Sequence, residues 1–325
     1  MYTREELKDI VNRAILNISF EDGADRLYEP VKYVLSTGGK RIRPVMSLMA
    51  CNLFSDSIDS AIKPAVGLEV FHNFTLVHDD IMDRSVLRRG SETVHKKWNQ
   101  NQAILSGDVM AFVANDCIAQ APAGCMPMVL KIYNKVAREV CIGQQLDMDF
   151  ETTPYVSHNE YLRMVELKTA VLIAGSLKIG AIIGGANSID SDLIYSFGLN
   201  LGLAFQVQDD ILDAFGDPQV FGKKIGGDII ANKKTLLLIK AYELASGASL
   251  SRLKELFPGK PDIDPEQKIE SVIAIYNELG IKEWAEDLAR QYIDRAHIAL
   301  DSIPTTPARK EVLQMLVTDL IGRKR

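Results

Sequence analysis

The sequence predicts an all-α protein, and three observations support this fold class. Apolar residues recur every three or four positions, as in Leu7, Ile10, Val11, Ala14 and Ile15, which is the period of a buried helix face. Runs that alternate apolar and polar residues, as half-buried strands do, are scarce. Clusters of Gly, Pro, Asn, Asp and Ser interrupt the helical pattern at intervals. These features predict roughly ten helices, a few of them about 20 to 30 residues long.

The expected helices lie between interruptions that contain residues which stop helices or form turns. In chain order the interruptions are 36–44, 52–57, 87–92, 120–127, 150–158, 184–191, 215–227, 257–267 and 302–307. No Gly/Ser linker, low-complexity segment or fixed-period repeat divides the sequence. We therefore expect a single domain over residues 1–325.

Composition and charge narrow the class of protein. Hydrophobic residues make up 47% and charged residues 25% of the chain, an ordinary globular balance. The net charge of -6 is opposite to that of a nucleic-acid-binding domain, so no nucleic acid partner is expected. The 4 cysteines form no CxxC pair, so free thiols are expected and a structural zinc site is not. Because the N-terminus also lacks a signal-peptide pattern, we expect a cytoplasmic protein.

The stretch TAVLIAGSLKIGAIIGGA, residues 169–186, is the most membrane-like part of the sequence. Lys178 interrupts its centre, where a charge would be costly in a bilayer. A large helical bundle also needs helices that are apolar on all sides. We therefore expect a buried core helix here and no stable membrane insertion.

The motif DDxxD occurs twice, once in HDDIMD and once in QDDILD, each directly after an apolar run. Residues four apart share one face of a helix, so Asp79 pairs with Asp83, and Asp209 pairs with Asp213. Clustered carboxylates repel one another unless a cation neutralises them. Hard oxygen ligands in this number suit Mg²⁺, which often bridges protein carboxylates to substrate phosphates. The repeated motif therefore predicts a magnesium and diphosphate site.

Basic clusters near the two acidic motifs could bind the same diphosphates. They are Lys40, Arg41 and Arg43 in GGKRIRP; Arg88 and Arg89 in VLRRGSE; and Lys223, Lys224, Lys233 and Lys234 in FGKK and NKKT. His72 and Gln206 lie on the same helix faces as the two aspartate pairs, seven and three positions upstream. Each cluster alone could be solvated surface, but an acidic helix followed by a basic loop occurs twice, which favours a functional site.

In this order the motifs GGKRIRP, EVFHNFTLVHDDIMD, LRRG, GQQLDMDF, ELKTA, FQVQDDILD and FGKKIGGDIIANKKT closely resemble those of the trans-isoprenyl diphosphate synthases, the polyprenyl synthetase family. The resemblance covers essentially the whole chain. It implies an all-α, single-domain isoprenoid synthase bundle around a central cavity, with a homodimer as the usual assembly. It also implies a Mg²⁺-dependent prenyltransferase that condenses isopentenyl diphosphate with an allylic diphosphate (dimethylallyl, geranyl or farnesyl).

The resemblance assigns a role to each matching residue. It implies an isopentenyl diphosphate pocket of Lys40, Arg43, His72 and Arg89. It implies about three Mg²⁺ per site, two held by Asp79 and Asp83 and a third by Asp209, with Asp210 and Asp213 in support through water or nearby lysines. It implies that Arg88, Lys168, Thr169, Gln206, Lys223 and Lys233 hold the allylic diphosphate, while Gln144 and Asp147 line the site. Whether Lys223 or Lys224 binds phosphate stays open, because Lys224 is an extra residue relative to some family members.

The implied chemistry needs no dedicated side-chain base. Positive charge stabilises the departing diphosphate, the allylic carbon–oxygen bond ionises, and the isopentenyl double bond attacks the cation. The released diphosphate then takes the proton. Water must be excluded, for which we expect an apolar cavity and a closing loop around 216–227, to be tested with Gly222→Pro.

Product length should depend on side-chain bulk upstream of Asp79. Phe74 lies five positions before it and the small Thr75 four before it, an arrangement that resembles short-chain synthases. This favours the twenty-carbon geranylgeranyl product, with the fifteen-carbon farnesyl product next. Residues of the next helix could set the limit instead: Met110, Phe112 or Ala114.

Three other functions share some of these features. A terpene cyclase would carry the first DDxxD, but its second metal motif differs from DDILD and GGKRIRP would then lack a purpose. A metal phosphohydrolase would need histidines at shared spacing, and His78 should instead point about 100° away from Asp79 and pack. A non-catalytic partner subunit of a heteromeric synthase would often lack one acidic motif, whereas this chain keeps both.

Overall fold

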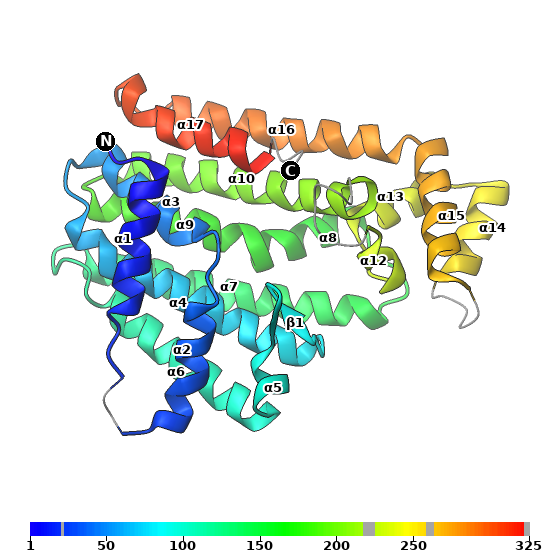
Figure 1. Cartoon of the computed structure of the whole chain (residues 1–325). Coiled ribbons are helices and arrows are strands. Elements are labelled where there is room, and N and C mark those ends of the chain that lie inside the picture. Colours follow the sequence, from blue (N-terminus) through cyan, green and yellow to red (C-terminus); the bar gives the residue numbers. More distant parts are fainter. Residues whose placement is uncertain (21–22, 217–224, 258–262, 322–325) are drawn as a thin grey trace. The chain divides into compact units, whose positions relative to one another are not determined.

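The computed structural model describes residues 1–20, 23–216, 225–257 and 263–321, and it confirms the all-α class (Figure 1). Contacts between residues divide the chain into two compact units. The first unit comprises 1–135, 175–195 and 303–313, and the second comprises 136–174, 196–302 and 314–325. The single domain over 1–325 stays a prediction.

The first unit contains the N-terminal helices and one short hairpin. Its elements are α1 (Arg4–Leu16), α2 (Asp25–Ser36), α3 (Ile42–Phe54), α4 (Asp59–Met82), β1 (Leu87–Arg88), β2 (Ser91–Glu92), α5 (Val94–Lys97) and α6 (Gln100–Ile118). Helix α1 begins with a capping box, in which Thr3 and Glu6 satisfy each other's backbone N–H groups. Helix α6 begins where Asn99 accepts a hydrogen bond from the amide of Gln102.

Several helices continue from one unit into the other along the chain. They are α7 (Met126–Thr152), α9 (Val171–Ile183), α10 (Ser188–Phe215) and α17 (Pro307–Ile321). The second unit adds α8 (His158–Val165), the π-helical turn η1 (Glu166–Ala170), α12 (Gly227–Ile230), α13 (Leu236–Leu244), α14 (Gly247–Leu256), α15 (Pro265–Glu278) and α16 (Ile281–Asp301). Tyr276, Leu236 and Val272 are among the buried residues at the centre of its core.

Close backbone contacts hold the helices of the first unit together. A Cβ atom on Gly180 of α9 would lie 1.8 Å from the carbonyl oxygen of Ser47 on α3. A Cβ atom on Gly67 of α4 would lie 2.8 Å from the carbonyl oxygen of Ala114 on α6. Only glycine fits at these two positions, because no side chain can occupy space already filled by backbone.

The apolar stretch 169–186 forms a core helix, as predicted. Leu172, Ile173, Leu177 and Ile179 are all buried. Lys178 reaches the surface of the first unit, where its ammonium group forms an ion pair with Asp192. In the part of the chain that the structure describes, no helix is long and apolar enough to span a bilayer.

Most predicted interruptions coincide with observed helix ends, since helices end at Ser36, Phe54, Ile118, Thr152 and Ile183. The interruption at 87–92 is a two-stranded antiparallel hairpin in which Leu87 pairs with Glu92. Other breaks were not predicted: between α1 and α2, at η1, and at Gly247 and Gly280, both of which have a positive φ. Residues 217–224, which hold most of the predicted closing loop including Gly222, lie outside the described residues.

Candidate functional site

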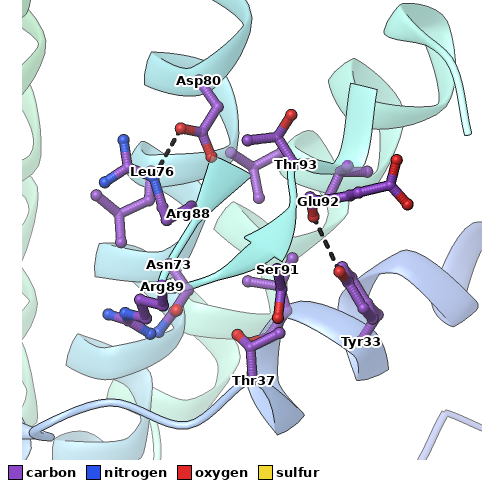
Figure 2. Close-up of a pocket in the computed structure, with 13 residues that line it drawn as sticks. Tyr33, Thr37, Asn73, Leu76, Asp80, Arg88, Arg89, Ser91, Glu92 and Thr93 are labelled. Carbon is purple, nitrogen blue, oxygen red and sulfur yellow. Dashed lines mark hydrogen bonds and ion pairs between the residues drawn. The ribbon is translucent and has the colours of Figure 1, made fainter. Parts of the chain in front are cut away.

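The first aspartate motif occupies the last turn of α4 and meets an arginine of the hairpin. The Nε atom of Arg88 donates to Asp80 at 2.7 Å (Figure 2). Its Nη2 atom donates to Asp79 at 3.3 Å. Asp80 is buried, whereas the side chain of Asp79 is 17% exposed and Asp83 is exposed at the helix end. The guanidinium of Arg88 therefore supplies the positive charge that the clustered carboxylates require.

Burial sets the protonation of the middle aspartate. It raises the pKa of Asp80, while the guanidinium of Arg88 opposes this shift by favouring the carboxylate. The two outer aspartates, Asp79 and Asp83, are the accessible members of the motif. The arrangement leaves the carboxylates of Asp79 and Asp83 partly or fully accessible, while the buried Asp80 anchors Arg88.

The hairpin that carries Arg88 is fixed from two sides. The hydroxyl of Tyr33 on α2 donates to the carbonyl oxygen of Glu92 at 2.9 Å (Figure 2). The hydroxyl of Thr93 donates to the carbonyl oxygen of Ser85 at 2.7 Å. A cavity of about 30 Å³ remains between the hairpin, α2 and α4, which is enough for about one water molecule. These bonds limit the positions that Arg88 can reach.

A second cationic cluster lies around the loop before α3. The Nη1 atom of Arg43 and the Nε2 atom of His72 on α4 are 3.1 Å apart. Arg89 donates to the carbonyl oxygen of Gly38 at 2.5 Å, and its Nη1 atom lies 2.9 Å from where a Cβ atom on Gly39 would be. Three of the four residues predicted for the isopentenyl diphosphate pocket thus lie on neighbouring segments of one unit. The fourth, Lys40, is exposed on the same loop.

One donor in this cluster has no acceptor. The Nε atom of Arg43 is buried and finds no hydrogen-bond partner among the described residues. Burial lowers the pKa of Arg43 to about 10, so the guanidinium stays charged at neutral pH. A buried, charged donor without an acceptor is costly unless an anion completes it. The residues present therefore fit a diphosphate.

A buried ion pair beneath this cluster was not predicted from the sequence. Arg41 donates to Glu69 of α4 at 2.8 Å and to the carbonyl oxygen of Leu35 at 2.6 Å. Arg41 has a φ of 50°, and the pair fixes the loop in this left-handed conformation. Glu69 lies three positions before His72, so helical spacing could have placed it on the same face.

The imidazole of His72 is neutral at physiological pH. Burial lowers its pKa well below the usual value, and the neighbouring cations Arg43, Arg89, Arg88 and Arg41 lower it further. Because a guanidinium can only donate, the Nε2 atom of His72 accepts the hydrogen bond from Arg43 and the ring proton lies on Nδ1. His72 therefore contacts Arg43 without adding a charge.

We therefore expect His72→Gln to keep the KM for isopentenyl diphosphate within about threefold, because the amide oxygen can still accept from Arg43. The apolar His72→Leu should raise this KM roughly 10- to 100-fold, as expected for the loss of a hydrogen bond to a charged group. In the unsubstituted protein, KM should show no step between pH 6 and 8 from this group. The measurement is steady-state kinetics at several pH values, with His297→Leu in α16 as the control. A step near pH 6.5 that His72→Gln removes would contradict this account.

The second aspartate motif lies on α10 in the second unit, and its members have different surroundings. Asp209 is exposed. Asp210 is buried and accepts from the hydroxyl of Tyr161 at 2.7 Å, the side-chain amide of Gln206 at 3.0 Å and the amide of Leu236 at 3.2 Å. Burial raises the pKa of Asp210 to about 7. Asp210 and its partners thus form a buried polar network that fixes this part of α10.

Asp213 holds the segment that follows α10. Its Oδ2 atom accepts from the amide of Asp228 at 3.0 Å, and its carbonyl oxygen accepts from the amide of Gly226 at 2.7 Å. Burial, and then the charge of Asp213, raise the pKa of Asp228 to about 6. Asp213 therefore connects the motif to α12. Its role as a metal ligand stays a prediction.

The predicted allylic residues Lys168 and Thr169 lie in the π-helical turn η1. The ammonium group of Lys168 donates to Asp147 of α7 at 2.5 Å. A Cβ atom on Gly143 would lie 2.3 Å from the backbone nitrogen of Lys168, and one on Gly202 would lie 2.6 Å from the Cα atom of Ala170. Two glycines thus let α7 and α10 approach the turn closely. π-helical turns are frequent at functional sites, and no pattern in residues 158–174 predicted this one.

The lysines after the second motif serve different purposes. Lys233 is exposed, and its ammonium group lies 3.8 Å from a carboxylate oxygen of Asp228. Lys234 instead donates to the carbonyl oxygens of Phe150 and Glu151, the last turn of α7. Lys223 and Lys224 lie outside the described residues. Gln144 has a buried side-chain nitrogen that finds no partner in the described part of the chain.

The donor set fits Mg²⁺. Both motifs present carboxylate oxygens, which are the ligands that this ion prefers. Within the described residues, no three His, Cys, Asp or Glu side chains converge to enclose a metal by themselves. Mg²⁺ commonly uses one or two protein carboxylates together with substrate phosphates and water. Asp79 with Asp83 could hold it in the first unit, and Asp209 in the second.

The residues expected to limit product length differ in how exposed their side chains are. Phe74 is half-buried, with its ring between those of Phe71 at 5.5 Å and His78 at 4.9 Å. Met110 and Ala114 on α6 are fully buried, whereas Phe112 is exposed on this chain. His78 packs as predicted, since its ring fills the space where a Cβ atom on Gly107 would lie.

Further members of the ring cluster lie on both sides of Phe74. Phe71 also meets the ring of Tyr133 at 5.5 Å, and both of these rings are buried. The hydroxyl of Thr75 donates to the carbonyl oxygen of His72 at 2.8 Å, so it is satisfied within α4. Phe74 is thus the large, partly accessible side chain at this level of the helix.

Comparison with known proteins identifies the family of this chain. The family model described as polyprenyl synthetase matches residues 24–276. A geranylgeranyl diphosphate synthase of Methanosarcina mazei is 37% identical, with 90% of this chain and 88% of that protein covered. A geranylfarnesyl diphosphate synthase of Aeropyrum pernix is 36% identical, with 92% and 95% covered. A crystal structure of a geranylgeranyl pyrophosphate synthase is 40% identical in sequence, and the match covers 100% of both chains. It superposes on this structure with a TM-score of 0.94. The chain therefore belongs to the polyprenyl synthetase family of prenyltransferases.

Proposed function

We propose that this protein condenses isopentenyl diphosphate with an allylic diphosphate, head to tail, to give a short all-trans prenyl diphosphate. The favoured product is geranylgeranyl diphosphate, with farnesyl diphosphate next. The named relatives, which are geranylgeranyl and geranylfarnesyl diphosphate synthases, support a product of about this length.

The observation that carries the proposal is that α4 serves two kinds of anion site. Its last turn presents the carboxylates Asp79 and Asp83, which suit a diphosphate bound through metal ions. Two turns upstream, His72 holds Arg43 with an unsatisfied charged donor, which suits a diphosphate bound directly by cations. A condensation needs two diphosphates, whereas a cyclase needs one. The pair of sites therefore favours condensation.

In the proposed reaction the residues of the first unit bind and orient the acceptor. Lys40, Arg43 and Arg89 hold the diphosphate of isopentenyl diphosphate, and the fixed geometry of Arg43 sets the direction of its double bond. Arg88 is a catalytic residue that stabilises negative charge on the departing diphosphate. Released diphosphate accepts the proton, so no side-chain base is needed.

The residues of the second unit act on the allylic diphosphate. Lys168, Thr169, Gln206 and Lys233 are proposed to bind it, with Lys223 as a further candidate. The π-helical turn and the Asp147 contact orient Lys168, which supports its proposed role. About three Mg²⁺ per site, proposed at Asp79, Asp83, Asp209 and Asp213, would supply positive charge that stabilises the leaving group when bound.

The test is direct: purified protein is incubated with Mg²⁺, labelled isopentenyl diphosphate and each allylic primer in turn, and the products are sized by chromatography. We expect elongation from dimethylallyl, geranyl and farnesyl diphosphate, ending mainly at twenty carbons. Farnesyl diphosphate alone serves as the control. A hydrocarbon formed without isopentenyl diphosphate would indicate a terpene cyclase, and failure to elongate any primer would fit a non-catalytic partner subunit.

A homodimer and a cytoplasmic location belong to the same proposal. Helix α6 exposes Leu105 (56%) and Phe112 (71%) seven positions apart on one face, which a second copy could cover. Sedimentation equilibrium should give twice the mass of the chain, and the mass of one chain would contradict this. All four cysteines are free, which suits a reducing compartment.

A further inference from the structure

The turn that carries Lys233 is held by a lysine of a different helix. Lys268 of α15 is only 6% exposed. Its ammonium group donates to the carbonyl oxygen of Ile229 at 2.7 Å and to the side-chain oxygen of Asn232 at 2.5 Å. It also lies 4.5 Å from the centre of the Phe257 ring. One buried cation thus joins both ends of the segment 229–232, directly before Lys233.

The partners of Lys268 are unusual for a buried charge. They are a backbone carbonyl, an amide oxygen and an aromatic ring, and no carboxylate pairs with it in the described part of the chain. Burial accordingly lowers its pKa. A buried charge without an acidic partner costs folding free energy, and a Met of similar length would avoid that cost. Its presence is therefore better explained by the conformation that it fixes.

That conformation determines where Lys233 lies. Asn232 has a φ of 57°, the left-handed region that side-chain-bearing residues seldom adopt. The amide of Lys233 then donates to the carbonyl oxygen of Asp228 at 2.9 Å, which closes the turn. Because the Asn232 side chain accepts from Lys268, α15 holds Asn232 in this conformation. A negative φ at Asn232 would send Lys233 in another direction.

Helix α15 also packs on the start of this segment. A Cβ atom on Gly226 would lie 2.6 Å from the side chain of Ile269, the neighbour of Lys268. The amide of Gly226 donates to Asp213 of the second aspartate motif. The segment 226–233 is therefore fixed at one end by Asp213 and along its length by two successive residues of α15.

We propose that Lys268 is a positioning residue, which acts through Asn232 to aim Lys233 at the allylic diphosphate. The proposal rests on the function proposed above, in which Lys233 binds that substrate. None of the predicted substrate-binding residues lies on α15. The proposal nevertheless gives this helix a specific effect on the binding of one of the two substrates, the allylic diphosphate.

The test compares Lys268→Met with the unsubstituted protein by steady-state kinetics with each substrate varied in turn. We expect the KM for the allylic diphosphate to rise roughly tenfold, as for a lost hydrogen bond to a charged group, with the KM for isopentenyl diphosphate unchanged within about twofold. Lys254→Met on α14, an exposed lysine, is the matched control and should change neither constant. Lys268→Arg, which keeps the donors, should recover part of the loss.

A second measurement shows whether Lys268 acts through Lys233. In a Lys233→Ala background, Lys268→Met should raise the allylic KM little further, because residues that act as one unit are not additive. Full additivity would overturn the proposal, as would an equal rise in both KM values. If Lys268→Met does not fold, Asn232→Gly removes the acceptor and leaves residue 232 free to depart from the left-handed conformation. It should raise the allylic KM in the same direction.

Hydrogen exchange separates this inference from the proposed function. Lys268→Met should speed amide exchange within 229–235 by at least about tenfold while residues of α10 keep their protection. This result supports the positioning role whatever reaction the protein catalyses. Unchanged exchange at 229–235 would overturn the inference even if prenyl transfer is demonstrated.

Discussion

Asp79→Asn is expected to lower kcat by roughly a thousandfold, the upper end of what one removed charge-stabilising group costs an enzyme. Asn keeps the size of the side chain and its hydrogen bond to Arg88 through the amide oxygen, but it loses the negative charge with which a carboxylate attracts Mg²⁺. The measurement is the initial rate with saturating labelled isopentenyl diphosphate and geranyl diphosphate.

Asp59→Asn is the matched control, because Asp59 is an exposed aspartate in the first turn of the same helix, α4. It should keep full activity. Titration with Mg²⁺ adds a second readout: Asp79→Asn should need a higher concentration for half its maximal rate, while the control should not. A Mg²⁺ dependence that Asp79→Asn leaves unchanged would remove Asp79 from the metal site.

Phe74→Ala should lengthen the product. The half-buried ring of Phe74 lies one turn before His78 and one turn after the core ring of Phe71. If the growing chain extends along this side of α4, removal of the ring opens space for at least one more five-carbon unit. We expect the main product to shift from twenty carbons to twenty-five or longer, measured by reversed-phase chromatography after removal of the diphosphate.

Phe71→Leu is the control for this prediction, since Phe71 is buried and packs against Tyr133. It should lower the melting temperature and leave product length unchanged. Longer products from Phe71→Leu as well would mean that general loosening of the ring cluster is responsible. An unchanged distribution for Phe74→Ala would leave the buried Met110 or Ala114 as the floor.

Helical spacing predicted correctly which residues share a helix face, but it could not predict which of them are buried. It grouped Asp79 with Asp83 and separated His78 from them, and the structure agrees because both statements follow from the helix period alone. It could not distinguish the environments of the adjacent Asp209 and Asp210. Asp210 is buried, and the hydroxyl of Tyr161, 49 positions away in sequence, donates to it.

The sequence did not predict which residues far apart in the chain interact with one another. The sequence indicated Arg88 as a phosphate ligand, and in the structure it donates to Asp79 and Asp80. Arg41 belonged to a cluster expected to bind phosphate, and instead it forms a buried pair with Glu69. Charge patterns indicate that cations are needed, but which of them face a ligand and which support the fold depends on three-dimensional packing.

The π-helical turn at 166–170 has a consequence for how this part of the chain can vary. A π-helical turn adds one residue to a helix, and each residue of an α-helix turns the chain by about 100°. The residues 158–165 and 171–174 on its two sides are therefore out of phase by that amount. Loss of one residue here would allow a regular α-helix and would close the wide turn that carries Lys168 and Thr169. The length of this segment therefore determines the direction in which Lys168 points.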